Sequence, residues 1–498
     1  MGIVIRQGIK STLSSYFGVA LGAFNLLFLL PKLLQPDQIG LIRVIQDMAF
    51  LLASLSQFGV SNIIDRFFPY FHDEKEKNKG FLYFILLLPI PGFTLLVVLF
   101  FLFQNYWTDL YTQSSPLLVH FFWYIIPLTL FTVYLQVLEA YSRAVMRIIV
   151  PVAVREVFLR AFLTIAVSLF AFGLIGFNGL VIAVVVSYFF GIIILLFYLR
   201  YLKILYLKTF DFKRNKERVL QILKYGGVIF LSGFVGVLSS RIDVIMLSVV
   251  SLPETGIFSI AFFMGTVIEI PRRTLSQISI PIIARGWKND DMETIKDIYR
   301  KTSLTQSVIG GILLVLLISN LTDLFNLIPN SEIYKTGFIV VVIIGFSRFI
   351  DMVAGVNTEI ILTSPFYRIN FILSVVFGIT NILFNYLLIP KYGMEGAAIG
   401  TFLSYLLINS TRYIIIYYKT KIQPFTLKHL WVFLLGVAAF VSVLFIPPAV
   451  SELESLFIIA IRTAVVSVVI IGGVYFLKIS DEINSIIKVF FNFLSKVF

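Results

Sequence analysis

Cysteine is absent from this chain of 498 residues, which excludes disulfide bonds and thiolate chemistry. Histidine is scarce too: His72, His120 and His429 are scattered and lack the spacing of metal ligands. The sequence also contains no P-loop, no HExxH and no GxSxG motif. It therefore gives no sign of ATP hydrolysis, a zinc hydrolase or a serine hydrolase, and we expect neither enzymatic activity nor a bound metal.

Charged residues are also few. They make up 13% of the chain, against roughly 25% in soluble proteins, while 59% of the residues are hydrophobic and the mean hydropathy is +0.95. This balance predicts an all-α polytopic membrane protein. Apolar runs of about 20 residues predict about fourteen transmembrane helices. The first ends near residue 34, and the others cover about 41–69, 80–103, 117–138, 150–172, 177–199, 226–250, 256–283, 304–327, 337–362, 367–389, 396–418, 430–449 and 455–477. The loops are too short for a catalytic domain outside the membrane.

The net charge of +13 lies mainly in loops that alternate along the chain. Lysine and arginine gather at 72–79, 141–149, 200–224 and 285–301. The positive-inside rule then places both termini and these loops in the cytoplasm. The basic excess is thus explained by topology and does not indicate nucleic acid. A contact of loop 200–224 with anionic lipid stays an open alternative.

Three short patterns occur twice, about 209 to 217 residues apart, which predicts a duplicated unit. They are 16–19 with 225–228, the turns 36–40 with 253–256, and 176–179 with 393–396. Because six spans is an even number, both copies start on the same side and are expected to be related by a pseudo-twofold axis along the membrane normal. The predicted organisation is a six-helix bundle at 1–206, a cytoplasmic linker at 207–224, a second six-helix bundle at 225–420, two further transmembrane helices at 421–480, and a cytoplasmic amphipathic tail helix at 481–498.

Many charges inside the predicted spans have an opposite charge three or four residues away. These pairs are Arg43 with Asp47, Glu139 with Arg143, Glu156 with Arg160, Glu269 with Arg272 and Arg273, and Arg348 with Asp351. One explanation is that each pair neutralises itself and holds helices together. The other is that the pairs nearer mid-membrane line a wet cavity, since charge inside a bilayer is costly and faces protein or water.

Arg241 differs from these. Asp243 is two residues away and so lies on another face of the helix. Because arginine stays charged, Arg241 needs either a carboxylate from another helix or an anionic ligand. A guanidinium suits a phosphate group particularly well.

These features resemble a known superfamily. The chain resembles the multidrug/oligosaccharidyl-lipid/polysaccharide exporter superfamily in its organisation. It has two six-span units, each opening on an aromatic-glycine pattern (Tyr16 to Val19, Tyr225 to Val228), a Pro-acidic turn between the first two spans of each unit, and two extra C-terminal spans. Within it, the chain looks like the Wzx-type flippases of O-antigen or capsule repeat units.

The resemblance implies that a lipid-linked oligosaccharide on undecaprenyl diphosphate is moved across the bacterial cytoplasmic (inner) membrane by alternating access through a cationic lumen. The arginines assigned to the substrate are Arg43, Arg241, Arg272, Arg273 and Arg348. The acidic residues assigned to a coupling ion, a proton or sodium, are Asp243, Glu269 and Asp351. No other cofactor is implied. The expected partners are the lipid-linked oligosaccharide, membrane lipids and other polysaccharide assembly proteins, and the expected state is a monomer.

Other functions stay open. A lipid II flippase and a cation-coupled multidrug exporter belong to the same superfamily. Proton-coupled exporters often carry a carboxylate in the first span, where this chain has only Asn25. A membrane polymerase or ligase would need a sizeable outside loop with catalytic residues. A purely structural membrane protein is the remaining alternative.

Overall fold

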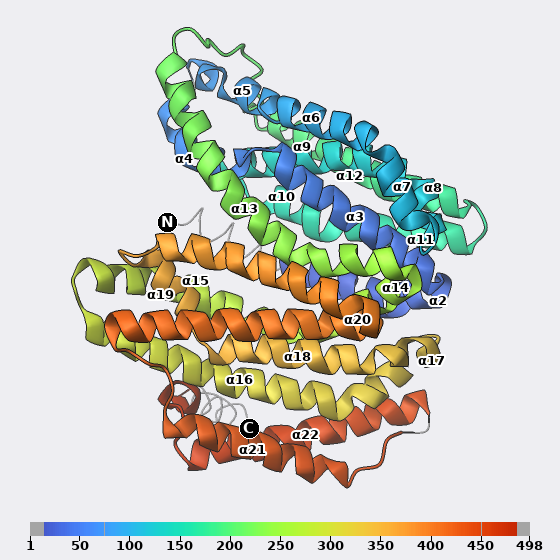
Figure 1. Cartoon of the computed structure of the whole chain (residues 1–498), viewed down its shortest axis with the longest axis vertical. Helices are drawn as coiled ribbons and strands as arrows, with labels where there is room; N and C mark the ends of the chain where they lie inside the picture. The colour runs from blue at the N-terminus through green and yellow to red at the C-terminus, as the bar shows by residue number, and fades with distance from the viewer. Residues whose placement is uncertain (1–13, 74, 450, 486–498) are drawn as a thin grey trace. The chain divides into compact units, whose positions relative to one another are not determined.

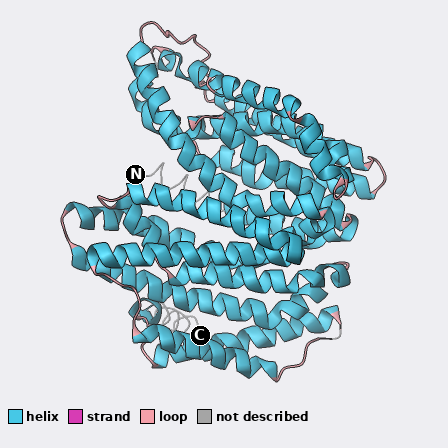
Figure 2. Ribbon diagram, viewed as in Figure 1, coloured by secondary structure: helices cyan, strands magenta, loops and turns pink. Residues whose placement is uncertain are grey.

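The computed structural model describes residues 14–73, 75–449 and 451–485 (Figure 1). Throughout this described part the regular elements are helices and no strand occurs (Figure 2). By contacts, the chain divides into two compact units at residues 1–256 and 257–498. The all-α prediction is therefore confirmed.

The first unit opens with a helical segment, Ser14–Leu33, that includes the π-helical turn η1 (Asn25–Leu29) and α2 (Leu30–Leu33). The elements that follow are α3 (Pro36–Ser56), α4 (Val60–Phe71), η2 (Lys77–Gly80), α5 (Phe81–Leu87), α6 (Pro89–Leu102), α7 (Gln104–Thr112), α8 (Pro116–Phe121), η3 (Phe122–Tyr124), α9 (Ile125–Ala144), α10 (Ile149–Ala153), η4 (Val154–Phe158), α11 (Leu159–Ala171), α12 (Phe177–Tyr201) and α13 (Lys216–Val250).

Helix α14 (Leu252–Thr266) starts at the end of the first unit and continues into the second. The second unit then contains η5 (Val267–Glu269), α15 (Ile270–Lys288), α16 (Met292–Asn326), α17 (Ser331–Tyr334), η6 (Lys335–Gly337), α18 (Phe338–Val353), α19 (Asn357–Thr363), α20 (Arg368–Thr420), α21 (Leu427–Leu444) and α22 (Glu452–Phe476).

Twelve segments of the described chain are long and apolar enough to cross a membrane. Two predicted spans are hidden in this count. Residues 149–171 are helical throughout, from α10 through the π turn η4 to α11, but they contain three charged residues, Arg155, Glu156 and Arg160, and are therefore not among the twelve. The 53 residues of α20 would be about 80 Å long if straight, and they contain both spans predicted at 367–389 and 396–418. With these two included, the structure has the predicted fourteen or so.

Helix α20 is in fact a hairpin. Pro390 lies inside it, and Gly393 has non-helical dihedral angles (φ 53°, ψ −131°) that favour glycine. The two arms are antiparallel and lie side by side (Figure 1). Gly400 on the second arm lies so close to Asn385 on the first that a Cβ there would be 2.6 Å from the Asn385 Oδ1. The corresponding pattern at 176–179 lies where α11 turns into α12.

The two Pro-acidic patterns, predicted to be turns between spans, form the first turns of helices α3 and α14. Pro36 is the first residue of α3, where the missing N–H costs nothing, and Gln35 and Gln38 form a capping box. Pro253 is the second residue of α14. The helix starts touch each other: a Cβ on Gly40 would lie 2.3 Å from the Leu252 carbonyl oxygen, and one on Gly256 would lie 2.0 Å from the Pro36 carbonyl oxygen.

Helix α13 packs against α3 and α4, which is why contacts group it with the first unit. The boundary predicted at 207–224 concerns the duplicated sequence and stays a prediction. Helices α21 and α22 pack on α16 and on each other in the second unit, around a core that includes Val432, Ala439, Val466 and Ile470. Most of the tail helix predicted at 481–498 lies outside the described residues.

Candidate functional site

Three residues of the first unit, Arg43, Asp47 and Arg241, form what we call the Asp47 cluster. Arg43 and Asp47 are one turn apart on α3, and their Nε and Oδ2 atoms are 2.8 Å apart. Arg241 on α13 donates from Nη1 to the other oxygen of Asp47. The Asp47 side chain is 2% exposed, whereas those of Arg43 and Arg241 are 34% and 27% exposed. One buried carboxylate thus pairs with two partly exposed guanidinium groups.

The Asp47 cluster explains how Arg241 is held. Its partner comes from another helix, one of the two possibilities that the sequence left open. The guanidinium also lies 5.0 Å from the centre of the Phe50 ring, a cation–π distance. The cluster carries a net positive charge because two arginines share one carboxylate.

A second set of charges in the first unit is balanced. Arg155 pairs with both Glu139 and Glu156, and Arg160 pairs with Glu156 at 3.0 Å. Asn25 of the first span donates to the Arg160 carbonyl oxygen at 2.9 Å. With two arginines and two glutamates, this set has the properties of a structural brace between helices.

In the second unit, seven side chains form what we call the Asp351 network: Glu269, Arg272, Arg273, Arg348, Asp351, Tyr405 and Asn409. Its centre is Asp351 on α18. One oxygen of Asp351 lies 3.1 Å from the Arg272 Nε, and the other accepts a hydrogen bond from Asn409 at 3.0 Å. Arg348 pairs with Glu269 at 3.2 Å and donates to the Tyr405 hydroxyl. The network thus ties α15, α18 and α20 together.

The structure confirms the predicted same-helix pairs Arg43 with Asp47, Glu156 with Arg160, and Glu269 with Arg273. Three others are wrong. Arg143 pairs with Asp65 instead of Glu139, at 3.0 Å. Arg272 pairs with Asp351 instead of Glu269, and Arg348 pairs with Glu269 instead of Asp351. Spacing along one helix brings two side chains near each other, but a carboxylate on a neighbouring helix can approach the guanidinium more directly.

Of the remaining predicted residues, Arg273 is 72% exposed and bonds Glu269 at the long distance of 3.5 Å. Asp243 is buried in α13. It belongs to the first unit and Asp351 to the second, and their common role in binding a coupling ion stays a prediction. Among the described residues no cluster of three or more histidines or carboxylates suits a metal ion.

The sequence analysis did not identify five charged residues of the predicted spans as site or pair members: Asp65, Arg155, Glu359, Arg412 and Arg462. Asp323 is fully buried in α16 and pairs with Arg462 of α22 at 2.6 Å. The signal that could have found Arg412 and Arg462 is a single charge inside an apolar run with no opposite charge one turn away.

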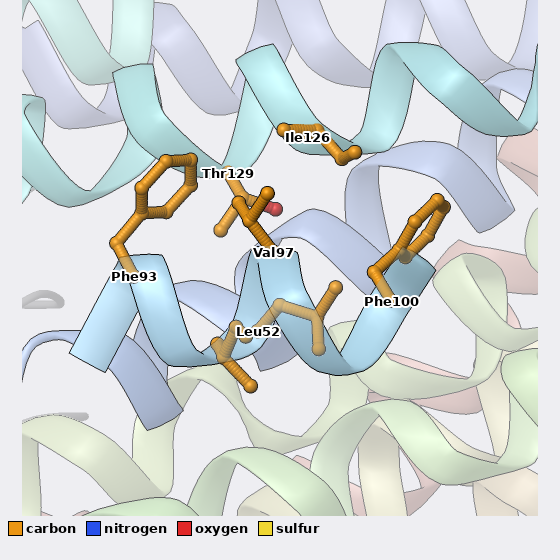
Figure 3. A pocket seen from close by; sticks show the side chains of 7 residues that line it. Leu52, Phe93, Val97, Phe100, Ile126 and Thr129 are labelled. Atoms are coloured by element: carbon orange, nitrogen blue, oxygen red, sulfur yellow. The ribbon is translucent and has the colours of Figure 1, made fainter. Parts of the chain in front are cut away.

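A small apolar pocket lies between α3, α6 and α9 (Figure 3). It is lined by Leu52, Phe93, Leu96, Val97, Phe100, Ile126 and Thr129. The Thr129 hydroxyl is already used, since it donates to the Ile125 carbonyl oxygen at 2.7 Å. This pocket offers no free polar group and is not a candidate for binding a charged substrate.

Comparison with known structures shows that this fold is similar to those of a flippase and of multidrug transporters. A lipid II flippase, MurJ, in an inward closed conformation matches 93% of this chain and 98% of its own, with a TM-score of 0.72 and 13% identity. A multidrug resistance MATE family transporter of the MOP superfamily matches in its inward-facing conformation over 80% of this chain and 94% of its own, with a TM-score of 0.64 and 12% identity. The outward-facing conformation of such a transporter matches with a TM-score of 0.55 and 14% identity, over 83% of this chain and 95% of its own. A search of curated proteins finds no match to this sequence.

The sequence itself matches the polysaccharide biosynthesis protein family over residues 5–287, more than half of the chain. The similar structures are transporters and flippases, and they belong to the superfamily that the sequence repeats resemble. The chain therefore belongs to the polysaccharide biosynthesis protein family and has the fold of the multidrug/oligosaccharidyl-lipid/polysaccharide exporter superfamily.

Proposed function

We propose that this protein is a flippase that moves an oligosaccharide linked to undecaprenyl diphosphate from the inner to the outer leaflet of the bacterial cytoplasmic membrane. The observation that carries the proposal is the Asp47 cluster, in which two partly exposed arginines share one buried carboxylate. The cluster keeps a net positive charge in a membrane-embedded helix pair, where an uncompensated cation is costly unless it meets an anion. The family's role in polysaccharide biosynthesis supports an anionic carrier lipid as that anion.

The chemistry of the arginines fits a diphosphate. A guanidinium donates two parallel hydrogen bonds to a phosphate, and such charge-assisted bonds are about twice as strong as neutral ones. In the first unit Arg43 and Arg241 supply this chemistry, and in the second unit Arg272, Arg273 and Arg348 do so. We assign the binding of the diphosphate headgroup to these cations.

The Asp351 network suggests how a coupling ion acts. Asp351 is the carboxylate partner of Arg272. A proton or sodium ion on Asp351 would neutralise that partner and leave Arg272 free to hold the substrate anion. Cation binding and substrate binding would then assist each other, which is a reciprocal coupling between two sites. Asp243 and Glu269 are the other carboxylates to which we assign this role.

A lipid II flippase is the second candidate, because the match to MurJ extends over 93% of the chain whereas the matches to the two multidrug transporter structures cover 80% and 83%. Both flippase functions need a site for a lipid-linked diphosphate and differ in the sugars. We assign the protein no enzymatic activity, and we propose a monomer that works beside other polysaccharide assembly proteins with both termini in the cytoplasm.

The proposal is tested in a strain that lacks its own oligosaccharide flippase. We expect the wild-type chain to restore surface polysaccharide, Arg241→Ala to restore almost none, and Arg241→Lys, which keeps the charge but loses the bidentate geometry, to restore part. Asp47 keeps Arg43 as its partner at 2.8 Å in either variant, so both are expected to fold and accumulate.

The matched control is Lys224→Ala, which removes an exposed cation from the same helix. Membrane abundance of every variant is measured in parallel. Normal surface polysaccharide from Arg241→Ala at normal abundance would falsify the role of Arg241 and leave it as a structural partner of Asp47.

A further inference from the structure

The connection from α12 to α13 is strongly basic. Residues 200–218, which we call the basic segment, run from the last turn of α12 to the first turn of α13. They contain seven lysines and arginines against two carboxylates, Asp211 and Glu217, which gives a net charge of +5. All seven cations are exposed: Arg200, Lys203, Lys208, Lys213, Arg214, Lys216 and Arg218.

The protein around the basic segment does not neutralise these cations. None of the seven forms an ion pair with a carboxylate in the described part of the chain. The Asp211 carboxylate instead accepts a hydrogen bond from the Arg214 backbone N–H at 3.0 Å. In the second unit, by contrast, Lys296, Lys301 and Lys335 each pair with a carboxylate three or four residues away. The excess charge of the basic segment is therefore available to an anionic partner outside the chain.

The basic segment is packed against the ends of three helices of the first unit (Figure 1). Phe210 in its middle is buried, and its ring centre lies 4.7 Å from that of Phe84 on α5 and 5.7 Å from that of Phe71 on α4. The Tyr141 hydroxyl on α9 donates to the Ile204 carbonyl oxygen at 3.2 Å. These contacts hold the cations beside the ends of α4, α5 and α9, which follow predicted transmembrane spans or begin them.

Large hydrophobic side chains are exposed among the cations. Tyr201, Leu207 and Phe212 are 83%, 61% and 47% exposed. At a membrane surface such side chains enter the boundary between headgroups and acyl chains, while neighbouring cations attract anionic headgroups. A nucleic acid or an acidic protein would use the cations and leave the hydrophobic side chains in water. The combination therefore favours a lipid surface.

We propose that the basic segment binds anionic phospholipid headgroups of the leaflet on which it lies, which the predicted topology makes the cytoplasmic one. The attraction acts within about 10 Å of the surface at 0.1 M salt. The segment begins in α12, which is long and apolar enough to cross the membrane, so its cations follow directly on a span. The ligand is a lipid of the surrounding membrane and not the transported molecule, so this role goes beyond the proposed function.

The test uses the full-length protein in phosphatidylcholine nanodiscs. Because the chain contains no cysteine, Thr209→Cys provides a single attachment site for a fluorophore on the basic segment. The quenchers are phosphatidylglycerol and phosphatidylcholine that carry the same nitroxide on an acyl chain near the headgroup. We expect phosphatidylglycerol to quench at a mole fraction at least about fivefold lower, the effect of one basic residue near an anionic surface. High salt, which screens charges, should reduce this preference. Equal quenching by the two lipids would overturn the proposal.

A triple variant removes three of the exposed cations. Lys213→Gln, Arg214→Gln and Lys216→Gln together are expected to abolish most of the preference for phosphatidylglycerol, because the net charge of the segment falls from +5 to +2.

The matched control removes the same charge from exposed positions of the second unit that are also predicted to face the cytoplasm. It combines Arg285→Gln, Lys288→Gln and Lys419→Gln, and it should keep the preference of the wild type. An equal loss of preference in the control and in the triple variant would mean that the effect comes from the total charge of the protein, and the basic segment would not be the site.

A second variant changes the charge in the other direction. Asp211→Asn with Glu217→Gln removes both carboxylates, and the amide oxygen of asparagine can still accept from the Arg214 backbone. We expect a stronger preference for phosphatidylglycerol, a gain that damage to the fold would not produce. If neither this variant nor the triple variant changes the preference, the proposal is wrong. If poly-glutamate changes the fluorescence while the two lipids quench equally, the segment binds an acidic protein instead.

Discussion

Asp351 is the residue at which transport and ion coupling meet in this account. We expect Asp351→Asn to abolish any dependence of transport on a proton or sodium gradient, because the neutral amide no longer binds the cation. The measurement is transport into vesicles with and without the gradient. The rival role is that Asp351 only neutralises Arg272, its partner at 3.1 Å.

A double variant separates these roles. If Arg272→Gln combined with Asp351→Asn restores gradient-dependent transport, the carboxylate is only a counter-charge and the coupling role is lost. The sequence alone suggested Arg348 for this experiment, since it lies three residues before Asp351. The structure shows that Arg272 is the partner to remove.

Charged residues within apolar runs can be recognised from the sequence, although Arg155, Arg412 and Arg462 were not identified in this way. Which charge pairs with which could not always be predicted. Arg43 and Asp47 pair as their spacing indicates, but Asp47 also accepts from Arg241, which is 194 positions away. That choice depends on how α13 packs against α3, a property of the folded unit that no local pattern contains.

At the scale of helices, the pair of Asp323 and Arg462 fastens α22 to α16. The Arg462 guanidinium donates to Asp323 at 2.6 Å and to the carbonyl oxygens of Ser319 and Ile446, while Asp323 also accepts from the Ala449 backbone at 2.9 Å. Four hydrogen bonds thus hold this pair within the second unit, while the Arg462 Nε is buried without a hydrogen-bond partner among the described residues.

Removal of one member should be costly. Arg462→Met leaves a buried carboxylate without its counter-charge, so we expect a loss of about 3–5 kcal/mol in unfolding free energy. The double variant Asp323→Asn with Arg462→Met keeps an acceptor for Ala449 and should lose less. Denaturation of the purified protein measures both, and a double variant that is less stable than Arg462→Met would contradict this explanation.

The contact of α3 with the start of α14 depends on two glycines. Gly256→Ala would place a methyl group about 2.0 Å from the Pro36 carbonyl oxygen, so the helix starts must move apart. We expect a lower unfolding temperature and reduced abundance. Gly233→Ala is the control: it also lies in a helix, α13, but its Cβ meets nothing within 4 Å, and alanine favours a helix by about 1 kcal/mol over glycine. Equal effects of the two changes would show that close packing is not the cause.

The ends of helices could be predicted where they depend on residues at the end itself. Pro36 marks the start of α3, and Gly393 marks the turn of α20, because only a few residue types suit these positions. The span at 150–172 shows the limit of such prediction. The apolar run at 150–172 does form a helix, but the π turn at Val154–Phe158 could not be predicted from hydropathy alone.

For the molecule as a whole, the distribution of lysine and arginine predicts the orientation in the membrane. Reporter fusions at Lys213 and Asn330 should lie on opposite sides, in the cytoplasm and outside respectively. Residues 233–250, 252–288 and 292–326, which lie between them, are each long and apolar enough to cross once. Reporters on the same side would mean that one of these three segments does not cross.

The direct test of the account is translocation of an oligosaccharide linked to undecaprenyl diphosphate by the purified protein in liposomes. The measurement follows how fast the labelled lipid becomes accessible to an impermeant sugar-modifying enzyme outside the vesicle. The account predicts that the wild type accelerates this exposure, that Arg241→Ala does so far less, and that Lys224→Ala matches the wild type. Exposure no faster than in liposomes without protein, combined with uptake of a cationic drug by the same vesicles, would contradict the account and make the protein a multidrug exporter.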